Sequence, residues 1–586
     1  MKINKVVVIG SGTMGSGIAA QLCNANIPVT LLDLKTEISQ KAKERIEKSR
    51  PPLLIDKSKI NGINVGNITD DFDLVSEADW IVEAVVERID IKHNIYEKIF
   101  NKRKKGSIVS SNTSSIPISV LSEKLSEEDK KDFCITHFFN PVRYMDLLEI
   151  VKNEKSDLEK IKHLKNFCEI DLGKGAIICN DTPGFLGNRI GVYGLMTSIY
   201  LAIDKGLNIE EVDKLTGPIS GRAKSATFRT ADVVGLDTLK SVSLTTYNKA
   251  TQDEEREMFN IPKILDQLID SNRLGQKTRS GFYKKNEDRS LSSINLRSGE
   301  YRPISKVYFD CFRVAKDQQS LSRKLKALCY GDDKGSKYFW EVTAKTLIYS
   351  ANRIPEISDD IVNIDNAMKW GFGWEMGPFE SWDAIGLKRS VTKMKNEGMK
   401  IPHWIMEMIK LGRNSFYITD NGSKSYWCPI NKKPISLIQS KKSINLSILK
   451  SSRAIIRRDL SASLIDLGDG VLNVEFHSIL QPTLNPIDGS YIEIINIALD
   501  LLDKNEFIGL VIGHEGQNFS AGANLNLVLE LSQQGEWKAL DYAVKMFQDL
   551  SQRIRFSNKP VIAAPFQLTL GGGVELVQPA THRVAA

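Results

Sequence analysis

One histidine and one carboxylate stand close enough in the sequence to act as an acid–base pair. His137 lies in the segment Thr136-His137-Phe138-Phe139-Asn140-Pro141, and Glu149 ends the next apolar stretch. A neutral imidazole can accept the proton of a substrate hydroxyl near pH 7 if a carboxylate fixes its tautomer and stabilises the imidazolium that forms. Spacing alone leaves a second interpretation open, in which His137 is hydrogen-bonded for structural reasons.

A glycine-rich loop near the N-terminus predicts a nucleotide site. Gly10, Gly12 and Gly15 follow an apolar run at 6–9 and precede a helical pattern at 16–24. Such glycines permit a tight turn, close approach of the backbone to a pyrophosphate and close packing of the helix, whose N-terminus attracts the phosphates.

Asp33 stands at the tip of the next predicted strand, 29–32. Its carboxylate is placed to bind a ribose diol and would repel a 2′-phosphate, which favours NAD over NADP. A helix cap or turn residue is the alternative for Asp33, and Lys35 keeps NADP open.

These residues require a sheet that brings strand ends together. Further strand candidates at 80–84 and 107–110 alternate with helical patterns, which predicts a Rossmann-type α/β domain with a parallel sheet over residues 1–180. Ser114 follows one of these strands and should therefore lie at the carboxyl edge of the sheet, where ligands bind. From 181 to 290 the apolar spacing becomes helical and predicts an all-helical domain.

Two blocks of the sequence repeat at an offset of 151 or 152 positions. Residues 209–213 are echoed at 361–365, and residues 228–236 are echoed at 379–387. The repeat predicts a duplicated helical unit. The remaining predicted parts are a connection at 291–335, the second helical copy at 336–430, a Lys/Ser-rich linker at 431–452 and another α/β unit at 453–586.

The composition is that of an ordinary globular chain, with 41% hydrophobic and 26% charged residues and a formal charge of +7. The basic run at 102–105 is interpreted as a solvated helix end, so no nucleic-acid partner is expected. Seven cysteines without a Cys-x-x-Cys pair predict a reducing, cytoplasmic location. No apolar stretch approaches the roughly 20 residues that span a bilayer, and neither a transmembrane segment nor a leader is expected.

Residues 1 to about 285 resemble L-3-hydroxyacyl-CoA dehydrogenase in the content and order of six motifs. The motifs are Gly10-Ser11-Gly12-Thr13-Met14-Gly15, Glu83-Ala84-Val85-Val86-Glu87, Ser111-Asn112-Thr113-Ser114-Ser115, His137-Phe138-Phe139-Asn140-Pro141, Asp181-Thr182-Pro183-Gly184-Phe185 with Asn188-Arg189, and Ser280-Gly281-Phe282-Tyr283.

The resemblance assigns roles to these residues. It implies that His137 is the catalytic base and Glu149 its orienting partner. Substrate contacts are implied for Ser114, Asn140 and Asn188. Cofactor contacts are implied for Gly10, Gly12, Thr13, Met14, Gly15, Asp33, Glu87, Lys92 and Asn112. Asn188 could instead serve interdomain packing, and Ser115 is interpreted as a helix cap.

The sequence departs from the family in one segment. Family members with a single helical domain carry Met-Gly-Pro-Phe where this chain has Ser225-Ala226-Thr227-Phe228, and the expected form occurs at Met376-Gly377-Pro378-Phe379 in the second copy. Because the second copy could occupy the place of a partner subunit, a dimer is not inferred.

Two loops in the last unit resemble those of the crotonase, or enoyl-CoA hydratase, superfamily. They are Phe519-Ser520-Ala521-Gly522-Ala523-Asn524-Leu525 and Gly571-Gly572-Gly573-Val574-Glu575-Leu576. The resemblance implies that Ala523 and Gly572 direct backbone N–H groups at a thioester oxygen and that Glu575 is an acid/base residue. A glycine-rich turn with a solvated glutamate is the alternative. Family hydratases carry a second glutamate beyond the position of Ala586, and Asn524 replaces their usual Asp. We therefore expect a partial crotonase-like domain from a truncated chain.

Together the motifs resemble a bifunctional fatty-acid β-oxidation protein with the dehydrogenase first. The expected cofactor is NAD, the expected substrate is an acyl-CoA thioester, no metal is expected, and a thiolase is a candidate partner. Two alternatives are a dehydrogenase of a free hydroxy acid and a non-catalytic nucleotide-binding scaffold. The crotonase-like loops argue against the first, and the set His137, Glu149, Ser114 and Asn188 argues against the second.

Overall fold

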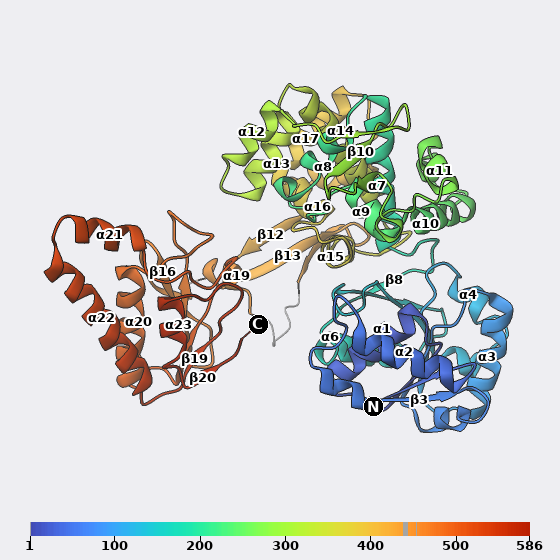
Figure 1. The fold of residues 1–586 in the computed structure, drawn as a ribbon, viewed down its shortest axis with the longest axis horizontal. Coiled ribbons are helices and arrows are strands. Elements are labelled where there is room, and N and C mark those ends of the chain that lie inside the picture. Colours follow the sequence, from blue (N-terminus) through green and yellow to red (C-terminus); the bar gives the residue numbers. More distant parts are fainter. Residues whose placement is uncertain (1, 438–443, 453, 586) are drawn as a thin grey trace. The chain divides into compact units, whose positions relative to one another are not determined.

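A computed structural model describes residues 2–437, 444–452 and 454–585 of the protein (Figure 1). The chain divides into two units, one of residues 1–416 and 427–433 and the other of residues 417–426 and 434–586. In the described part of the chain, no helix has both the length and the apolar character needed to cross a membrane. All seven cysteines are described, and each is a buried free thiol.

An eight-stranded sheet forms the N-terminal part of the first unit, in the order β3-β2-β1-β4-β5-β6-β7-β8. Only β6 and β7 pair antiparallel; every other neighbouring pair is parallel. The strands are β1 (Val6–Ile9), β2 (Val29–Asp33), β3 (Ile63–Asn67), β4 (Trp80–Glu83), β5 (Ile108–Ser111), β6 (Phe133–Phe138), β7 (Leu147–Lys152) and β8 (Gly175–Cys179). The four strands predicted from the sequence are confirmed to within one residue. Because β1, β2, β4, β5 and β6 run in the same direction, their carboxyl ends share one edge.

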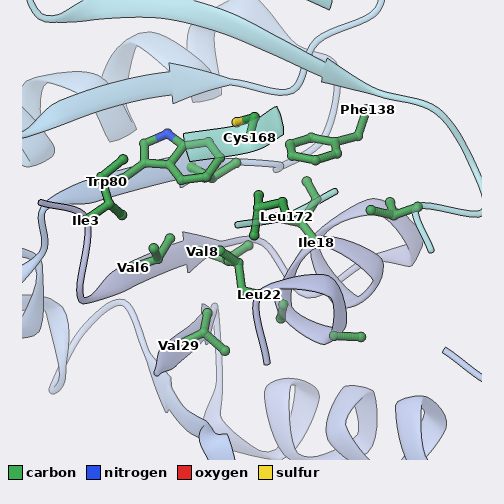
Figure 2. Close-up of a cluster of buried hydrophobic side chains, with 14 of the residues drawn as sticks. Ile3, Val6, Val8, Ile18, Leu22, Val29, Trp80, Phe138, Cys168 and Leu172 are labelled. Atoms are coloured by element: carbon green, nitrogen blue, oxygen red, sulfur yellow. The ribbon is translucent and has the colours of Figure 1, made fainter. Parts of the chain in front are cut away.

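Helices cover this sheet and complete its core. They are α1 (Thr13–Asn24), α2 (Thr36–Lys48), α3 (Ile89–Lys102), α4 (Ile118–Leu121), α5 (Glu127–Lys130) and α6 (Leu158–Ile170). Figure 2 shows Ile18 and Leu22 of α1 in one apolar cluster with Val8, Trp80 and Phe138 from three strands. Full burial of each such side chain contributes about 1.5–3 kcal/mol to the stability of the fold. The strand ends that carry the polar site residues are therefore supported by a well-packed core.

Helices dominate the rest of the first unit. The helices nearest the sheet domain in sequence are α7 (Gly187–Asp204), α8 (Ile209–Leu215), α9 (Phe228–Val234), α10 (Leu236–Lys249) and α11 (Lys263–Asp270), and the later ones are α14 (Lys334–Asn352), α15 (Ile361–Phe372), α16 (Pro378–Ile385), α17 (Leu387–Asn396) and α18 (His403–Lys410). α7 is buried along most of its length and packs against α14, α15 and α10. A helix that is apolar nearly all round is expected to be buried in this way.

Two boundary predictions change with the structure. The predicted connection at 291–335 is folded: it holds β10 (Leu291–Ile294), β11 (Tyr301–Pro303), α12 (Asp310–Lys316) and α13 (Leu321–Tyr330). β9 (Tyr283–Lys285) pairs with β10, so the segment 181–290, predicted to be all-helical, ends in a strand. These strands are too short for their period of two to be visible in the sequence.

The predicted linker at 431–452 also contains regular structure. β14 (Lys433–Ser436) is an edge strand of a three-stranded sheet in the order β12-β13-β14. The other two strands are β12 (Tyr417–Asp420) and β13 (Ser423–Cys428), and α19 (Leu446–Lys450) follows the sheet in sequence. Residues 438–443 of this range lie outside the described residues.

The second unit is built on a six-stranded sheet in the order β15-β16-β17-β18-β19-β20. Its strands are β15 (Ile455–Arg458), β16 (Ala462–Asp466), β17 (Val471–Phe476), β18 (Gly509–Ile512), β19 (Val561–Ala563) and β20 (His582–Arg583), and its helices are α20 (Gly489–Asp503), α21 (Leu525–Gln533), α22 (Trp537–Arg555) and α23 (Gly572–Val577). The predicted strand–turn–strand at 462–472 is confirmed as the antiparallel pair β16–β17. Its turn needs positive φ at Gly468 and Gly470, which glycine adopts at little cost.

Candidate active site

His137 and Glu149 face each other across the only antiparallel pair of the large sheet. They are register partners on β6 and β7, and Nδ1 of His137 lies 2.6 Å from Oε2 of Glu149. Glu149 is fully buried and His137 is 6% exposed. A close hydrogen bond to a carboxylate places the proton on Nδ1 and leaves Nε2 as the basic nitrogen.

The second oxygen of Glu149 binds the start of the helical domain. Oε1 accepts hydrogen bonds from the backbone N–H of Leu186 at 3.0 Å and of Gly187 at 2.6 Å. Gly187 is the first residue of α7, whose unpaired N–H groups and dipole favour a negative charge. A Cβ at Gly187 would lie 2.9 Å from the Phe139 ring and 3.0 Å from Leu147, so a larger residue would have to displace these two side chains. Both oxygens of Glu149 are therefore engaged.

Two aromatic rings border the imidazole, because the ring centroids of Phe139 and Phe185 lie 4.7 and 5.7 Å from that of His137. Within the part of the chain that the structure describes, Nε2 of His137 has no hydrogen-bond partner. The imidazole of His137 is thus held from one side in an apolar surround, with its second nitrogen available to a ligand.

The three predicted substrate contacts lie on loops or helix ends next to these elements. Ser114 is half-buried after β5, Asn188 is half-buried in the first turn of α7, and Asn140 is exposed after β6. None of their side chains makes a hydrogen bond to another described residue. Polar groups left without an internal partner are available to a ligand.

The glycine loop lies between β1 and α1, as the motif predicts. Gly10 has a φ of +100°, and a Cβ at Gly15 would lie 1.8 Å from the carbonyl oxygen of Gly10. A Cβ at Gly12 would meet nothing within 4 Å. Among the described residues, no acceptor is bound by the N–H groups of Gly12, Thr13, Met14 and Gly15. The loop therefore offers an open cradle of backbone donors at a helix N-terminus, which fits a pyrophosphate.

Asp33 ends β2 beside this loop. Its carboxylate accepts hydrogen bonds from the backbone N–H and hydroxyl of Ser11 at 2.7 and 2.6 Å and from the N–H of Leu34 at 2.7 Å. The N-cap of α2 is Lys35, so Asp33 does not cap that helix. This position leaves its carboxylate next to the cradle, where a ribose would follow a bound pyrophosphate.

A buried ion pair lies beneath the loop that carries Ser114. Glu83, at the end of β4, accepts hydrogen bonds from Lys92 Nζ at 2.7 Å, Tyr96 Oη at 2.6 Å and Ser111 Oγ at 2.7 Å. Both members of the Glu83–Lys92 pair are almost wholly buried. Lys92 is 3.3 Å from Glu87. Its ammonium therefore holds Glu83 and Glu87, and a direct contact of Lys92 with the cofactor stays a prediction.

Glu87 reaches from this pair to the serine loop. Its carboxylate accepts hydrogen bonds from the hydroxyls of Thr113 and Ser115, the latter at 2.9 Å. Burial raises the pKa of Glu87, but the Lys92 ammonium and the two hydroxyl hydrogen bonds outweigh it and hold the pKa below its ordinary value. The interpretation of Ser115 as a helix cap is wrong, since the N-cap of α4 is Pro117 and the hydroxyl of Ser115 donates to Glu87.

The side chain of Asn112 binds the backbone of the neighbouring strand in this structure. Its Oδ1 accepts a hydrogen bond from the N–H of Phe138 at 3.0 Å, next to His137. The end of β5 is thereby tied to the end of β6, directly beside His137.

The crotonase-like loops of the second unit also lie against each other. A Cβ at Gly522 would lie 2.9 Å from the backbone nitrogen of Gly572, and a Cβ at Gly572 would lie 3.5 Å from that of Ala523. Neither Ala523 N–H nor Gly572 N–H donates to an acceptor in the described ranges. Glu575 is exposed one turn into α23, and Asn524 caps α21.

Sequence reasoning missed a buried cluster beside Asn188. Arg189 is fully buried and donates to Asp253 at 2.6 Å, to Tyr349 at 2.7 Å and to Glu356 at 2.9 Å. Arg189 was part of a quoted motif, but its partners lie 64 to 167 positions away and carry no local signal. The role of Glu83 as the buried partner of Lys92 was missed as well, although its position nine residues before Lys92 could have indicated it.

A glycine loop of the phosphate-binding type and a histidine–glutamate pair lie at one edge of a mostly parallel sheet. This combination defines a Rossmann-type dehydrogenase. No cluster of three or more metal-ligating side chains occurs among the described residues. The family model "3-hydroxyacyl-CoA dehydrogenase, NAD binding domain" matches residues 5–182, and the model of the C-terminal domain of that family matches residues 184–285. A third model, "Enoyl-CoA hydratase/isomerase", matches residues 480–586.

Similar proteins agree with these models. The chain is 42% identical, over all of its length, to a probable 3-hydroxyacyl-CoA dehydrogenase from Bacillus subtilis, of which it covers 76%. It is 31% identical, again over all of its length, to a putative fatty acid oxidation complex trifunctional enzyme from Rickettsia felis, of which it covers 77%. The chain belongs to the 3-hydroxyacyl-CoA dehydrogenase family and carries an enoyl-CoA hydratase-type module.

A solved structure shares the fold of the larger part. The 3-hydroxybutyryl-CoA dehydrogenase of Escherichia coli matches 70% of this chain and 99% of its own, with a TM-score of 0.54 and 18% identity. At that identity the likeness concerns the fold alone.

Proposed function

We propose that this protein oxidises the 3-hydroxyl of an (S)-3-hydroxyacyl-CoA to a ketone, with His137 as the base. The observation that carries the proposal is the engagement of Nδ1 by Glu149, which leaves Nε2 to take a proton. The O–H proton passes to Nε2, the C3–H leaves as hydride, and the electron pair of the O–H bond forms the C=O bond. Glu149, anchored on the first turn of α7, stabilises the imidazolium that results.

NAD is the proposed cofactor, and when bound it accepts the hydride. The free N–H groups from Gly12 to Gly15 would hold its pyrophosphate, and Asp33 would accept hydrogen bonds from its ribose diol. Glu87, kept ionised by Lys92, would fix the loop next to it, so Lys92 acts through Glu87. A carboxylate at Asp33 disfavours the 2′-phosphate of NADP.

The substrate class is supported by the family and by the polar groups around His137. We propose that Ser114, Asn140 and Asn188 contact the hydroxyl or thioester oxygen, since their side chains have no other hydrogen bond in the described part of the chain. A free hydroxy acid as substrate is less consistent with the hydratase-type module, and a scaffold role is less consistent with the buried base.

Hydration of an enoyl-CoA is the second proposed activity, which would supply the substrate of the first. The N–H groups of Ala523 and Gly572 would bind the thioester oxygen as an enolate develops, and Glu575 would move a proton. The nearness of the two loops, 3.5 Å from a Cβ at Gly572 to the nitrogen of Ala523, supports this.

We infer that the two helical segments are copies of one unit, with the second in the place that a partner subunit would take. Corresponding carboxylates make corresponding hydrogen bonds: Asp213 accepts from the N–H of Phe228 and Asp365 accepts from the N–H of Phe379, each at 2.7 Å. Asp232 accepts from the N–H of Phe282, and Asp383 likewise accepts from the N–H of Phe416, each at 2.8 Å.

A cytoplasmic location and a thiolase partner complete the proposal. Seven buried free thiols suit a reducing compartment. A 3-ketoacyl-CoA is the chemical class of substrate that thiolytic cleavage consumes.

The dehydrogenase proposal is tested with acetoacetyl-CoA. We expect oxidation of NADH in its presence, much slower oxidation of NADPH, and a loss of at least about 100-fold in His137→Ala. His403→Ala is the matched control, because the His403 side chain is 84% exposed. Equal rates for wild type and His137→Ala would overturn the assignment of His137 as the base. No turnover with 3-ketoacyl-CoAs of any chain length would overturn the proposed substrate class.

The hydratase proposal has its own assay, the hydration of crotonyl-CoA followed by loss of enoyl absorbance. We expect Glu575→Gln to lower any such rate at least about 100-fold without changing NADH oxidation. Equal hydration rates for this variant and wild type would show that Glu575 is not the acid/base residue.

A further inference from the structure

An arginine without a counter-charge lies in a cavity of the helical part of the first unit. The side chain of Arg222 donates no hydrogen bond and forms no ion pair with any described residue. Its guanidinium lies over the ring of Trp374 at 4.4 Å and near that of Phe339 at 6.0 Å. Its side chain is half-buried, and this burial lowers its pKa to about 10. Taking a guanidinium out of water is costly, and proteins normally offset the cost with a carboxylate.

The neighbouring titratable groups do not provide that negative charge. Burial raises the pKa of the Cys329 thiol to about 12, so it is neutral near pH 7. Burial also raises the pKa of Tyr338, whose hydroxyl is bound to Ser198 at 2.6 Å. The residues that line the cavity include no Asp or Glu. The site therefore carries a net positive charge.

The cavity offers a hydroxyl beside this cation. Its lining includes Thr343, which is 6% exposed. The Oγ1 of Thr343 forms no hydrogen bond of ordinary geometry with a described residue, and the Cys329 thiol is its polar neighbour. An unpaired buried hydroxyl costs about 1–3 kcal/mol. The cavity volume is about 20 Å³, which is enough for one particle the size of a water molecule and too small for a nucleotide phosphate.

Corresponding loops of the two helical segments meet here. Arg222 follows Gly221 and Trp374 follows Gly373, and both glycines have positive φ, +69° and +65°. The N–H of Glu375 donates to the carbonyl of Gly221 at 2.7 Å, which joins the loops. These loops lead into Ser225–Phe228 and Met376–Phe379, the segments at which the first copy departs from the family pattern.

We propose that this cavity binds one small monovalent anion of chloride size, held by the guanidinium of Arg222 and the hydroxyl of Thr343. The anion would neutralise the arginine and satisfy the hydroxyl, and it would thereby fasten the loop at 218–222 to α14 and to the loop before α16. The inference rests on the cavity alone and does not depend on the reaction proposed above.

The test is the thermal stability of the full chain in sodium chloride against sodium gluconate at equal ionic strength. Wild type should melt about 2–4 °C higher in chloride once chloride is well above its dissociation constant, because the anion binds only the folded state. Arg222→Met and Thr343→Val should lose this difference. Lys224→Met, which removes an exposed cation of the same loop, should keep it.

Crystals of wild type grown in bromide give an independent measurement, which does not rely on the variants folding. The anomalous difference map should show bromide within hydrogen-bond distance of the Arg222 guanidinium. Bromide found only elsewhere on the protein, no chloride effect in wild type, or the same effect in Arg222→Met would each overturn the proposal.

Discussion

Replacing Glu149 by Gln should disable the base while leaving the fold intact. The amide of Gln offers one carbonyl oxygen and one NH₂ group, whereas both oxygens of Glu149 accept hydrogen bonds. If the NH₂ group faced Leu186 and Gly187, two buried N–H donors would lose their acceptor, at about 1–3 kcal/mol each. The carbonyl oxygen should therefore stay on the start of α7, and the NH₂ group should face His137.

That orientation forces the wrong tautomer on the histidine. Nδ1 of His137 must then accept a hydrogen bond, so its proton moves to Nε2, which can no longer take the substrate proton. Such a change of tautomer costs a histidine base about 10³–10⁴ in rate. At 1.36 kcal/mol for each factor of ten, this corresponds to about 4–5.5 kcal/mol of barrier.

The assay is NADH oxidation with acetoacetyl-CoA, together with thermal unfolding. We expect kcat of Glu149→Gln to fall by about 10³–10⁴, KM for NADH to change less than about twofold, and the melting temperature to stay close to that of wild type. Glu154→Gln is the control, because Glu154 is an exposed carboxylate just beyond the same strand. A rate of Glu149→Gln within about tenfold of wild type would refute this account of the pair.

The other predictions concern the cofactor loop and the buried acids beside it. Gly15→Ala should lower the free energy of unfolding in urea by about 1–3 kcal/mol or more, because its Cβ would overlap the Gly10 carbonyl. Gly12→Ala should unfold like wild type but raise KM for NADH about tenfold or more. Similar unfolding of the two variants would contradict the packing argument. Glu83→Gln should lower the free energy of unfolding by about 3–5 kcal/mol, since it removes the main partner of a buried ammonium, and a loss below about 1 kcal/mol would contradict this. The pKa of Glu87 is held below its ordinary value in the fold, so ionised Glu87 stabilises the protein above its unfolded pKa and loses this effect as pH falls. The stability difference between wild type and Glu87→Gln should therefore shrink below about pH 4.5, and a difference independent of pH would argue against an ionised Glu87.

Much of the sheet and its functional edge could be predicted from the sequence. The β-branched run of β1, the glycines after it and Asp33 at the tip of β2 each carry a local pattern with a physical cause. His137 and Glu149 could be proposed as a pair, but their register across an antiparallel pair could not, because strand direction is set by pairing over the whole sheet.

Contacts between distant segments were outside the reach of these patterns. The two backbone donors that bind Oε1 of Glu149 lie 37 and 38 positions away, in the next domain. Lys92 could be placed near the cofactor, yet its burial between Glu83 and Glu87 depends on packing that a motif does not encode. The strands in 291–335 were missed because they have only three or four residues.

The bond between Glu149 and the first turn of α7 bears on how such enzymes can be assembled from parts. The sheet domain contains both members of the proposed acid–base pair, so by sequence it looks like a separable catalytic module. Its carboxylate, however, is oriented by backbone that belongs to the helical domain. A sheet domain produced alone, or joined to a foreign helical domain, would retain the histidine but lose the anchor of its partner. The smallest unit that evolution or an engineer can exchange is therefore the sheet together with the beginning of α7, and the recombination boundary lies inside the helix rather than between the domains.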